Sequence, residues 1–137
     1  ELKAVFASNP ANLRPVDFQR IAATYPSDSP EFEQVYMKAV ELYPNDPEAN
    51  LNAANIALRH GDNAAAANYL RNAGDSPEAM FTRATLAAVN GDLPRAVEMF
   101  DAAAAAGMER AADERDRIDA IIKRPTVTYL IEPVKGR

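Results

Sequence analysis

Apolar and charged residues separate onto two sides of a helix in the segment 108–123. The apolar side carries residues spaced three, four or seven positions apart: Met108, Ala111, Ala112, Ile118 and Ile122. The opposite side is charged: Glu109, Arg110, Asp113, Glu114, Asp116 and Arg117. Such a pattern is typical of an amphipathic helix with one buried face, here preceded by Gly107 and ended by Pro125. We predict a helix over this range that caps a helical stack.

The charged side of this helix contains two oppositely charged pairs at a spacing of four residues. They are Arg110 with Glu114 and Asp113 with Arg117. Side chains four apart lie on neighbouring turns and can pair. We therefore expect these two ion pairs on the solvent side of the helix.

The middle of the chain repeats itself with an offset of thirty residues. Pro47-Glu48-Ala49 corresponds to Pro77-Glu78-Ala79, and Gly61-Asp62 corresponds to Gly91-Asp92. An earlier copy lies thirty-four residues upstream, where Ala39 corresponds to Ala73. Repetition at this period indicates stacked supersecondary units.

Each copy carries signals for two helices. Ser29, Asp46 and Ser76 each precede Pro-Glu, the order of an N-cap, a proline that needs no N–H donor, and an acid at the positive helix end. Gly61 and Gly91 are expected to end helices, with the following Asp as the next N-cap. The predicted helices form three pairs: 15–25 with 30–43, 47–60 with 63–73, and 77–90 with 93–106.

These signals divide the chain into three parts. Residues 1–12 are predicted to be the end of a preceding helix and a linker, residues 13–123 the helical repeats with their capping helix, and residues 124–137 an extended tail. Within the tail, Thr126–Ile131 favours a strand. We interpret it as a segment that packs on the last helix; the alternative is strand addition to a partner or to a second copy.

The repeats resemble the tetratricopeptide family. Residues 37–49, Met-Lys-Ala-Val-Glu-Leu-Tyr-Pro-Asn-Asp-Pro-Glu-Ala, are similar to the family's end-of-repeat signature, and Ala96-x3-Phe100-x2-Ala103 matches its second-helix signature. The resemblance implies an all-α, right-handed α-α superhelix of about three helix pairs plus the capping helix. The chain departs from the pattern where the second copy is about four residues short after Ala73.

A narrower resemblance concerns residues 29–35 and 49–54. These runs look like the helical-repeat segment that follows the OmpA-like domain in some bacterial envelope proteins. That resemblance implies a periplasmic or cell-envelope location.

Composition narrows the function classes. The chain has 20 acidic and 15 basic residues, a formal net charge of −5, which disfavours nucleic acid as a partner. No Cys is present, and the single His60 lies at a predicted helix end with no triad around it. No apolar run approaches the length of a membrane span. We therefore predict no catalytic, cofactor or metal site, and no insertion into a membrane.

The resemblance also implies where a partner binds. In the family, the first helix of each pair lines the concave side of the stack, and its side chains contact a protein or peptide. The equivalent residues of the first pair are Arg14, Asp17 and Ile21. In the second and third pairs we predict partner contacts from Leu51, Asn55, Leu58, Arg59, Phe81 and Thr85, with Glu48 and Glu78 at the helix starts.

The roles of these residues follow from their chemistry. Leu51 and Phe81 occupy equivalent places in successive copies and can accept an apolar side chain, whereas Asn55 can bind a peptide backbone and Arg59 a carboxylate. The resulting hypothesis is a protein–protein interaction scaffold. The alternative is a structural spacer or assembly module of a larger envelope protein, in which Leu51 and Phe81 are covered by intramolecular contacts.

Overall fold

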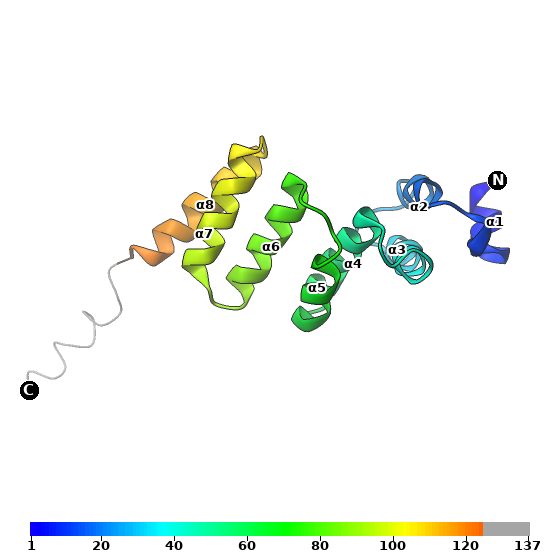
Figure 1. Ribbon diagram of the computed structural model, residues 1–137, viewed down its shortest axis with the longest axis horizontal. Helices are drawn as coiled ribbons and strands as arrows, with labels where there is room; N and C mark the ends of the chain where they lie inside the picture. The colour runs from blue at the N-terminus through cyan, green and yellow to red at the C-terminus, as the bar shows by residue number, and fades with distance from the viewer. Residues whose placement is uncertain (125–137) are drawn as a thin grey trace, which may run out of the picture.

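The computed structural model describes residues 1–124, and the regular elements in this part of the chain are all helices (Figure 1). Residues 125–137, which include the predicted strand-favouring segment, lie outside the described residues. The elements in chain order are α1 (Leu2–Ser8), the 3-10 turn η1 (Pro10–Asn12), α2 (Pro15–Ala22), α3 (Pro30–Leu42), α4 (Pro47–Arg59), α5 (Asn63–Leu70), α6 (Pro77–Val89), α7 (Leu93–Ala105) and α8 (Glu109–Ile122).

The predicted N-caps are confirmed. The Ser29 hydroxyl accepts from the backbone N–H of Phe32 at 3.1 Å, and the Ser76 hydroxyl accepts from that of Ala79 at 3.1 Å. Asp46 Oδ2 accepts from the N–H of Ala49 at 2.9 Å. Each bond satisfies one of the backbone donors that a helix start leaves without an intrahelical partner.

The predicted glycine stops are also confirmed. Gly61 and Gly91 have φ of 75° and 87°, the left-handed region that suits glycine. The following N–H groups then reach back to close the helices, Asp62 to the Ala57 carbonyl at 2.8 Å and Asp92 to the Ala87 carbonyl at 2.9 Å. The same aspartates cap α5 and α7, so one Gly-Asp pair both ends a helix and begins the next.

Consecutive helices pack against one another along the whole described chain, from α1 at the blue end to α8 at the orange end (Figure 1). α4 packs on α5, α6 packs on α7, and α8 packs on the far side of this last pair against α7. The predicted all-α stack of helix pairs with a terminal helix is therefore confirmed.

Two helices end three residues earlier than predicted. α2 ends at Ala22 and α5 at Leu70, rather than at 25 and 73. In both places the chain tightens into turns with a spacing of three residues, as in the bond from the N–H of Tyr25 to the Ala22 carbonyl at 3.0 Å. The shortened second copy thus places a helix of 8 residues where the third copy has one of 13.

The core consists of three clusters along the stack. The N-terminal cluster includes Phe18 and Val35, and the C-terminal cluster includes Phe100 and Ile118. Between them, α4, α5 and α6 meet at a small cluster that contains Leu70 and three alanines. Several alanines at helix crossings are 0% exposed: Ala53, Ala54, Ala66, Ala79, Ala84, Ala96, Ala103 and Ala111. Small side chains at these points let the helix backbones approach closely.

Replacing Ala96 by Leu tests this packing. Ala96 is 0% exposed, so the larger side chain must displace its neighbours, and we expect a loss of about 1–3 kcal/mol in the free energy of unfolding. The measurement is urea unfolding followed by circular dichroism. Ala102→Leu on the exposed side of the same helix is the matched control and should leave stability nearly unchanged. Equal stabilities of the two variants would contradict the assigned crossing.

Candidate functional site

Five of the six predicted partner-contact residues line one cavity of about 450 Å³ between α4 and α6. They are Asn55, Leu58, Arg59, Phe81 and Thr85. The start of α3 contributes Phe32, and α8 contributes Arg110. The structure thus brings together residues as far apart in sequence as Phe32 and Arg110.

Leu51, the sixth predicted residue, lines an adjoining cavity of about 600 Å³. The two cavities share Asn52, Asn55 and Arg110, so they form one continuous surface, which we call the α4–α6 groove. Leu51 is half-buried and also packs against the small cluster at the junction of α4, α5 and α6. Only part of its side chain therefore faces the groove.

Phe81 is half-buried as well, and two side chains contact its ring. Phe100 of α7 packs edge-on at 5.1 Å between ring centroids, and the Arg110 guanidinium lies 4.3 Å from the Phe81 centroid. The second contact is a cation–π interaction between α8 and α6. Phe81 is thus partly covered by its own chain. The binding hypothesis expects an accessible Phe81 and the spacer hypothesis a covered one, and the half-buried ring lies between these two expectations.

Arg110 is a groove residue that the sequence did not predict as a partner contact, as are Phe32 and Asn52. The predicted pairs Arg110–Glu114 and Asp113–Arg117 do not form; Arg117 instead binds Glu114 at 2.6 Å. Arg110 reaches Phe81, because α8 packs on α7 and so brings its first turn to the groove. The spacing of residues within α8 cannot predict a contact between α8 and another helix.

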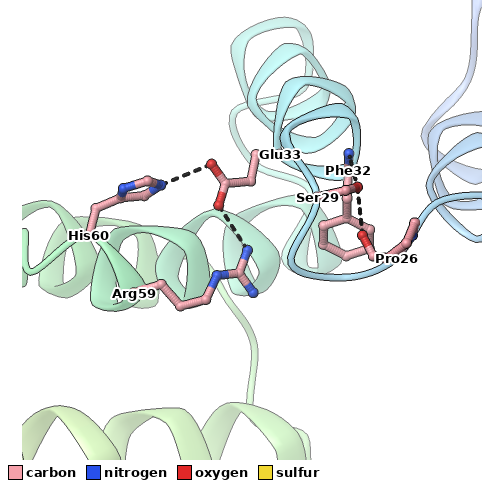
Figure 2. Close-up of polar contacts among 6 residues, drawn as sticks. All are labelled: Pro26, Ser29, Phe32, Glu33, Arg59 and His60. Carbon is pink, nitrogen blue, oxygen red and sulfur yellow. Dashed lines mark hydrogen bonds and ion pairs between the residues drawn. The ribbon is translucent and has the colours of Figure 1, made fainter.

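Arg59 belongs to a polar cluster that joins α3 to the end of α4. Figure 2 shows the Glu33 carboxylate between Arg59 and His60. Arg59 Nη2 donates to Glu33 Oε2 at 3.1 Å, and His60 Nε2 lies 2.9 Å from Glu33 Oε1. The hydrogen bond with His60 is the main cause that holds the pKa of Glu33 below its ordinary value of 4.5, and Arg59 adds to it.

His60 is the C-cap residue of α4. The predicted role of this side chain at a helix end is confirmed, and its exposed ring also ties α4 to α3 (Figure 2). Arg59, by contrast, already engages a carboxylate of its own chain, so it is less available to a partner than the sequence suggested.

In each of two groove asparagines, Asn52 and Asn55, one atom of the side-chain amide forms a hydrogen bond within the chain. Thr82 Oγ1 lies 3.0 Å from Asn55 Oδ1 and 3.1 Å from the Glu78 carbonyl, so the hydroxyl donates between these acceptors. Asn52 Nδ2 donates to the Glu48 carbonyl at 3.0 Å. The remaining polar atoms, Asn55 Nδ2 and Asn52 Oδ1, are a donor and an acceptor one turn apart on α4.

Part of the chain matches a known family of helical repeats. The model of the tetratricopeptide repeat matches residues 35–68, a segment that runs from the middle of α3 through α4 into α5. After this match, the pair α6–α7 repeats the same kind of N-cap and the same glycine stop, with Ser76 before α6 and Gly91 after it. This match and the all-helical stack around it support a tetratricopeptide-repeat family. Searches of curated proteins and of solved structures found no match.

Tetratricopeptide repeats in general mediate protein–protein interactions, and the chain shares that module. The narrower resemblance to envelope proteins with an OmpA-like domain receives no support from these comparisons and stays a prediction. Within residues 1–124, no helix is long and apolar enough to cross a membrane. No group of three or more His, Asp or Glu side chains in the same range is placed to hold a metal ion.

In the first helix pair, Asp17 and Ile21 are buried, contrary to the prediction of a partner surface there, whereas the Arg14 side chain is 71% exposed. Asp17 is 7% exposed and Ile21 is 2% exposed. Asp17 Oδ2 accepts from the backbone N–H of Arg14 at 2.9 Å at the start of α2, and Ile21 belongs to the N-terminal core cluster. The side chains of α1 also pack on that cluster, so the apolar face of α2 is used for folding.

Glu48 likewise has an intramolecular role. Its carboxylate accepts hydrogen bonds from Gln19 of α2 and from the Tyr36 hydroxyl of α3 at 3.4 Å. Burial is the main cause that raises the pKa of Tyr36 to about 12, and burial also raises the pKa of Glu48. Glu48 therefore ties three helices together at one end of the groove.

Replacing Glu33 by Gln tests the cluster of Figure 2. Because the folded-state pKa of Glu33 is lowered, its carboxylate stabilises the fold above pH 4.5, and this contribution disappears as the pH falls through the folded-state pKa. We expect the variant to be less stable at pH 7 by up to about 1 kcal/mol, with the difference shrinking in acid.

The measurement is thermal unfolding between pH 3 and 7. Glu41→Gln is the matched control, because Glu41 is an exposed residue of the same helix that pairs with Lys38, three residues before it. A stability difference for Glu33→Gln that stays constant across the pH range would contradict the assigned role.

Proposed function

We propose that this domain is a scaffold that binds a peptide segment of a partner protein in the α4–α6 groove. The observation that carries the proposal is the convergence of Asn55, Leu58, Arg59, Phe81 and Thr85 on one cavity. These residues come from the first helices of two successive repeats, and the family match supports an interaction role for such repeats.

The polar atoms of the groove suit a peptide backbone. Within residues 1–124, Asn55 Nδ2 forms no hydrogen bond and can donate to a backbone carbonyl, while Thr82 engages the other end of that amide. In the same part of the chain, Asn52 Oδ1 accepts no hydrogen bond and can accept from a backbone N–H, while Asn52 Nδ2 binds the Glu48 carbonyl. A donor and an acceptor one turn apart match the alternation of C=O and N–H along an extended chain.

The apolar surface suits a single large side chain. Phe32, Leu58 and Phe81 line the same cavity and are all half-buried, so each retains surface that a ligand can cover. Burial of an apolar side chain supplies affinity without a need for further polar contacts.

Arg110 is the cation best placed to meet an acidic group of the ligand. Its guanidinium lies over Phe81, is exposed, and lines both parts of the groove. Arg59 already shares the Glu33 carboxylate, so a ligand must compete with that pair. We expect a partner segment with one large apolar residue near an acidic one.

Asn55→Asp tests the proposal with little change to the fold. The substitution keeps an oxygen for Thr82 but replaces the free amide donor by a carboxylate oxygen, so it should repel a backbone carbonyl. Peptides are first selected from a random display library on the parent domain, and their affinities are then measured by fluorescence polarisation. We expect about tenfold weaker binding to the variant.

Asn45→Asp is the matched control. Asn45 is exposed in the turn between α3 and α4, so the same change of charge should leave affinity unaltered. Selected peptides that bind both variants like the parent would place the binding surface elsewhere. A library that yields no binder at all would favour the spacer alternative, in which the groove holds no ligand.

A further inference from the structure

A second groove lies against the opposite face of α6. It has a volume of about 470 Å³ and is formed by the end of α5, the second half of α6 and the start of α7. Its lining includes Leu70, Leu86 and Met99 as apolar residues and Arg71, Arg83 and Arg95 as cations. We call it the basic groove. Arg83 and Leu86 lie on the side of α6 turned away from Phe81 and Thr85, so the two grooves are separate surfaces.

The early end of α5 shapes the basic groove. Arg71 is the C-cap residue of α5, and the last turn of this 8-residue helix forms one wall. Arg83 reaches across to that wall, where its Nη2 donates to the Leu70 carbonyl at 2.8 Å. The opposite wall begins with Asp92 and Arg95 in the first turn of the 13-residue α7. The groove therefore arises from the shortened second repeat of this chain.

The arginines that line the basic groove differ in whether their guanidinium groups have partners in the chain. Arg83 binds Leu70 and lies 3.6 Å from Asp75, whose side chain is 94% exposed. Asp92 is the acidic residue of the lining, and its Oδ1 accepts from the backbone N–H of Arg95 at 3.3 Å as the cap of α7. Within residues 1–124, the guanidinium groups of Arg71 and Arg95 form neither a hydrogen bond nor an ion pair.

Three arginines around one groove stand out on a chain with a formal net charge of −5. Cations that are not used by their own chain favour an acidic ligand, and guanidinium groups bind carboxylates with two parallel hydrogen bonds. The exposed parts of Leu86 and Met99 add an apolar floor between the cations. A small inorganic anion would leave this floor uncovered.

We propose that the basic groove binds an acidic peptide segment of a partner protein, one in which carboxylates flank a large apolar residue. The apolar side chain covers Leu86 and Met99, and the carboxylates bind Arg71 and Arg95. This site is independent of the α4–α6 groove, so the domain presents two peptide-binding surfaces on opposite faces of α6.

The test uses a fluorescein-labelled peptide of eight residues with two central leucines flanked by glutamates and aspartates. Binding to the parent domain should weaken as salt is raised, because the charges are exposed. The double variant R71E/R95E should bind at least about tenfold more weakly, because two attractions become repulsions. Two control peptides separate the contributions: one with lysines in place of the acids, and one with alanines in place of the leucines. Both should bind more weakly than the probe.

R20E/R124E is the matched control variant, since it changes the net charge equally at two exposed arginines outside the groove lining. It should bind the probe like the parent. Equal loss in both double variants, or equal binding of the alanine peptide, would overturn the proposal, because general electrostatics would then explain the binding. A dimer in analytical ultracentrifugation that disappears in R71E/R95E would also overturn it, because the occupant would be a second copy of the chain.

Discussion

The structure depends on the close approach of neighbouring helices at buried alanine residues. Ala54 and Ala79 at the junction of the second and third pairs, and Ala84 and Ala96 within the third, are all 0% exposed. Short side chains allow this approach but bury little apolar area at each crossing. Polar contacts between helices therefore add to the packing, as between Glu33 and Arg59 or between Arg83 and the Leu70 carbonyl.

The junction between the second and third pairs concentrates the surfaces with binding potential. The smallest core cluster lies there, and α6 forms a wall of both grooves. Phe81 and Thr85 face one groove, whereas Arg83 and Leu86 face the other. Their chemistry differs: asparagines and aromatic residues line the first, and arginines around an aliphatic floor line the second. One helix thus contributes to two surfaces of different chemistry.

Self-contacts determine how much of each predicted residue remains for a partner. Arg110 lies over Phe81, Glu33 engages Arg59, and part of Leu51 packs into the junction cluster. The amide donor of Asn55 and the exposed guanidinium of Arg110 are the groups that these contacts leave available. In the first pair, Ile21 packs into the N-terminal cluster and Asp17 caps its own helix, so of the three predicted residues only Arg14 is exposed.

The sequence by itself determined where the paired helices begin, their order and the resemblance to tetratricopeptide repeats. Caps such as Ser76 and stops such as Gly91 act within one helical turn, so neighbouring residues suffice to predict them. Because the repeats are similar, equivalent residues lie on the same side of the helical stack. Five of the predicted residues therefore line one cavity: Asn55, Leu58, Arg59, Phe81 and Thr85. Only the tertiary structure decided that Arg110 joins them and that Arg71, Arg83 and Arg95 surround a second groove. These contacts depend on where one helix crosses another and where α5 ends, and such distances between elements are not encoded in the spacing of residues along a single helix.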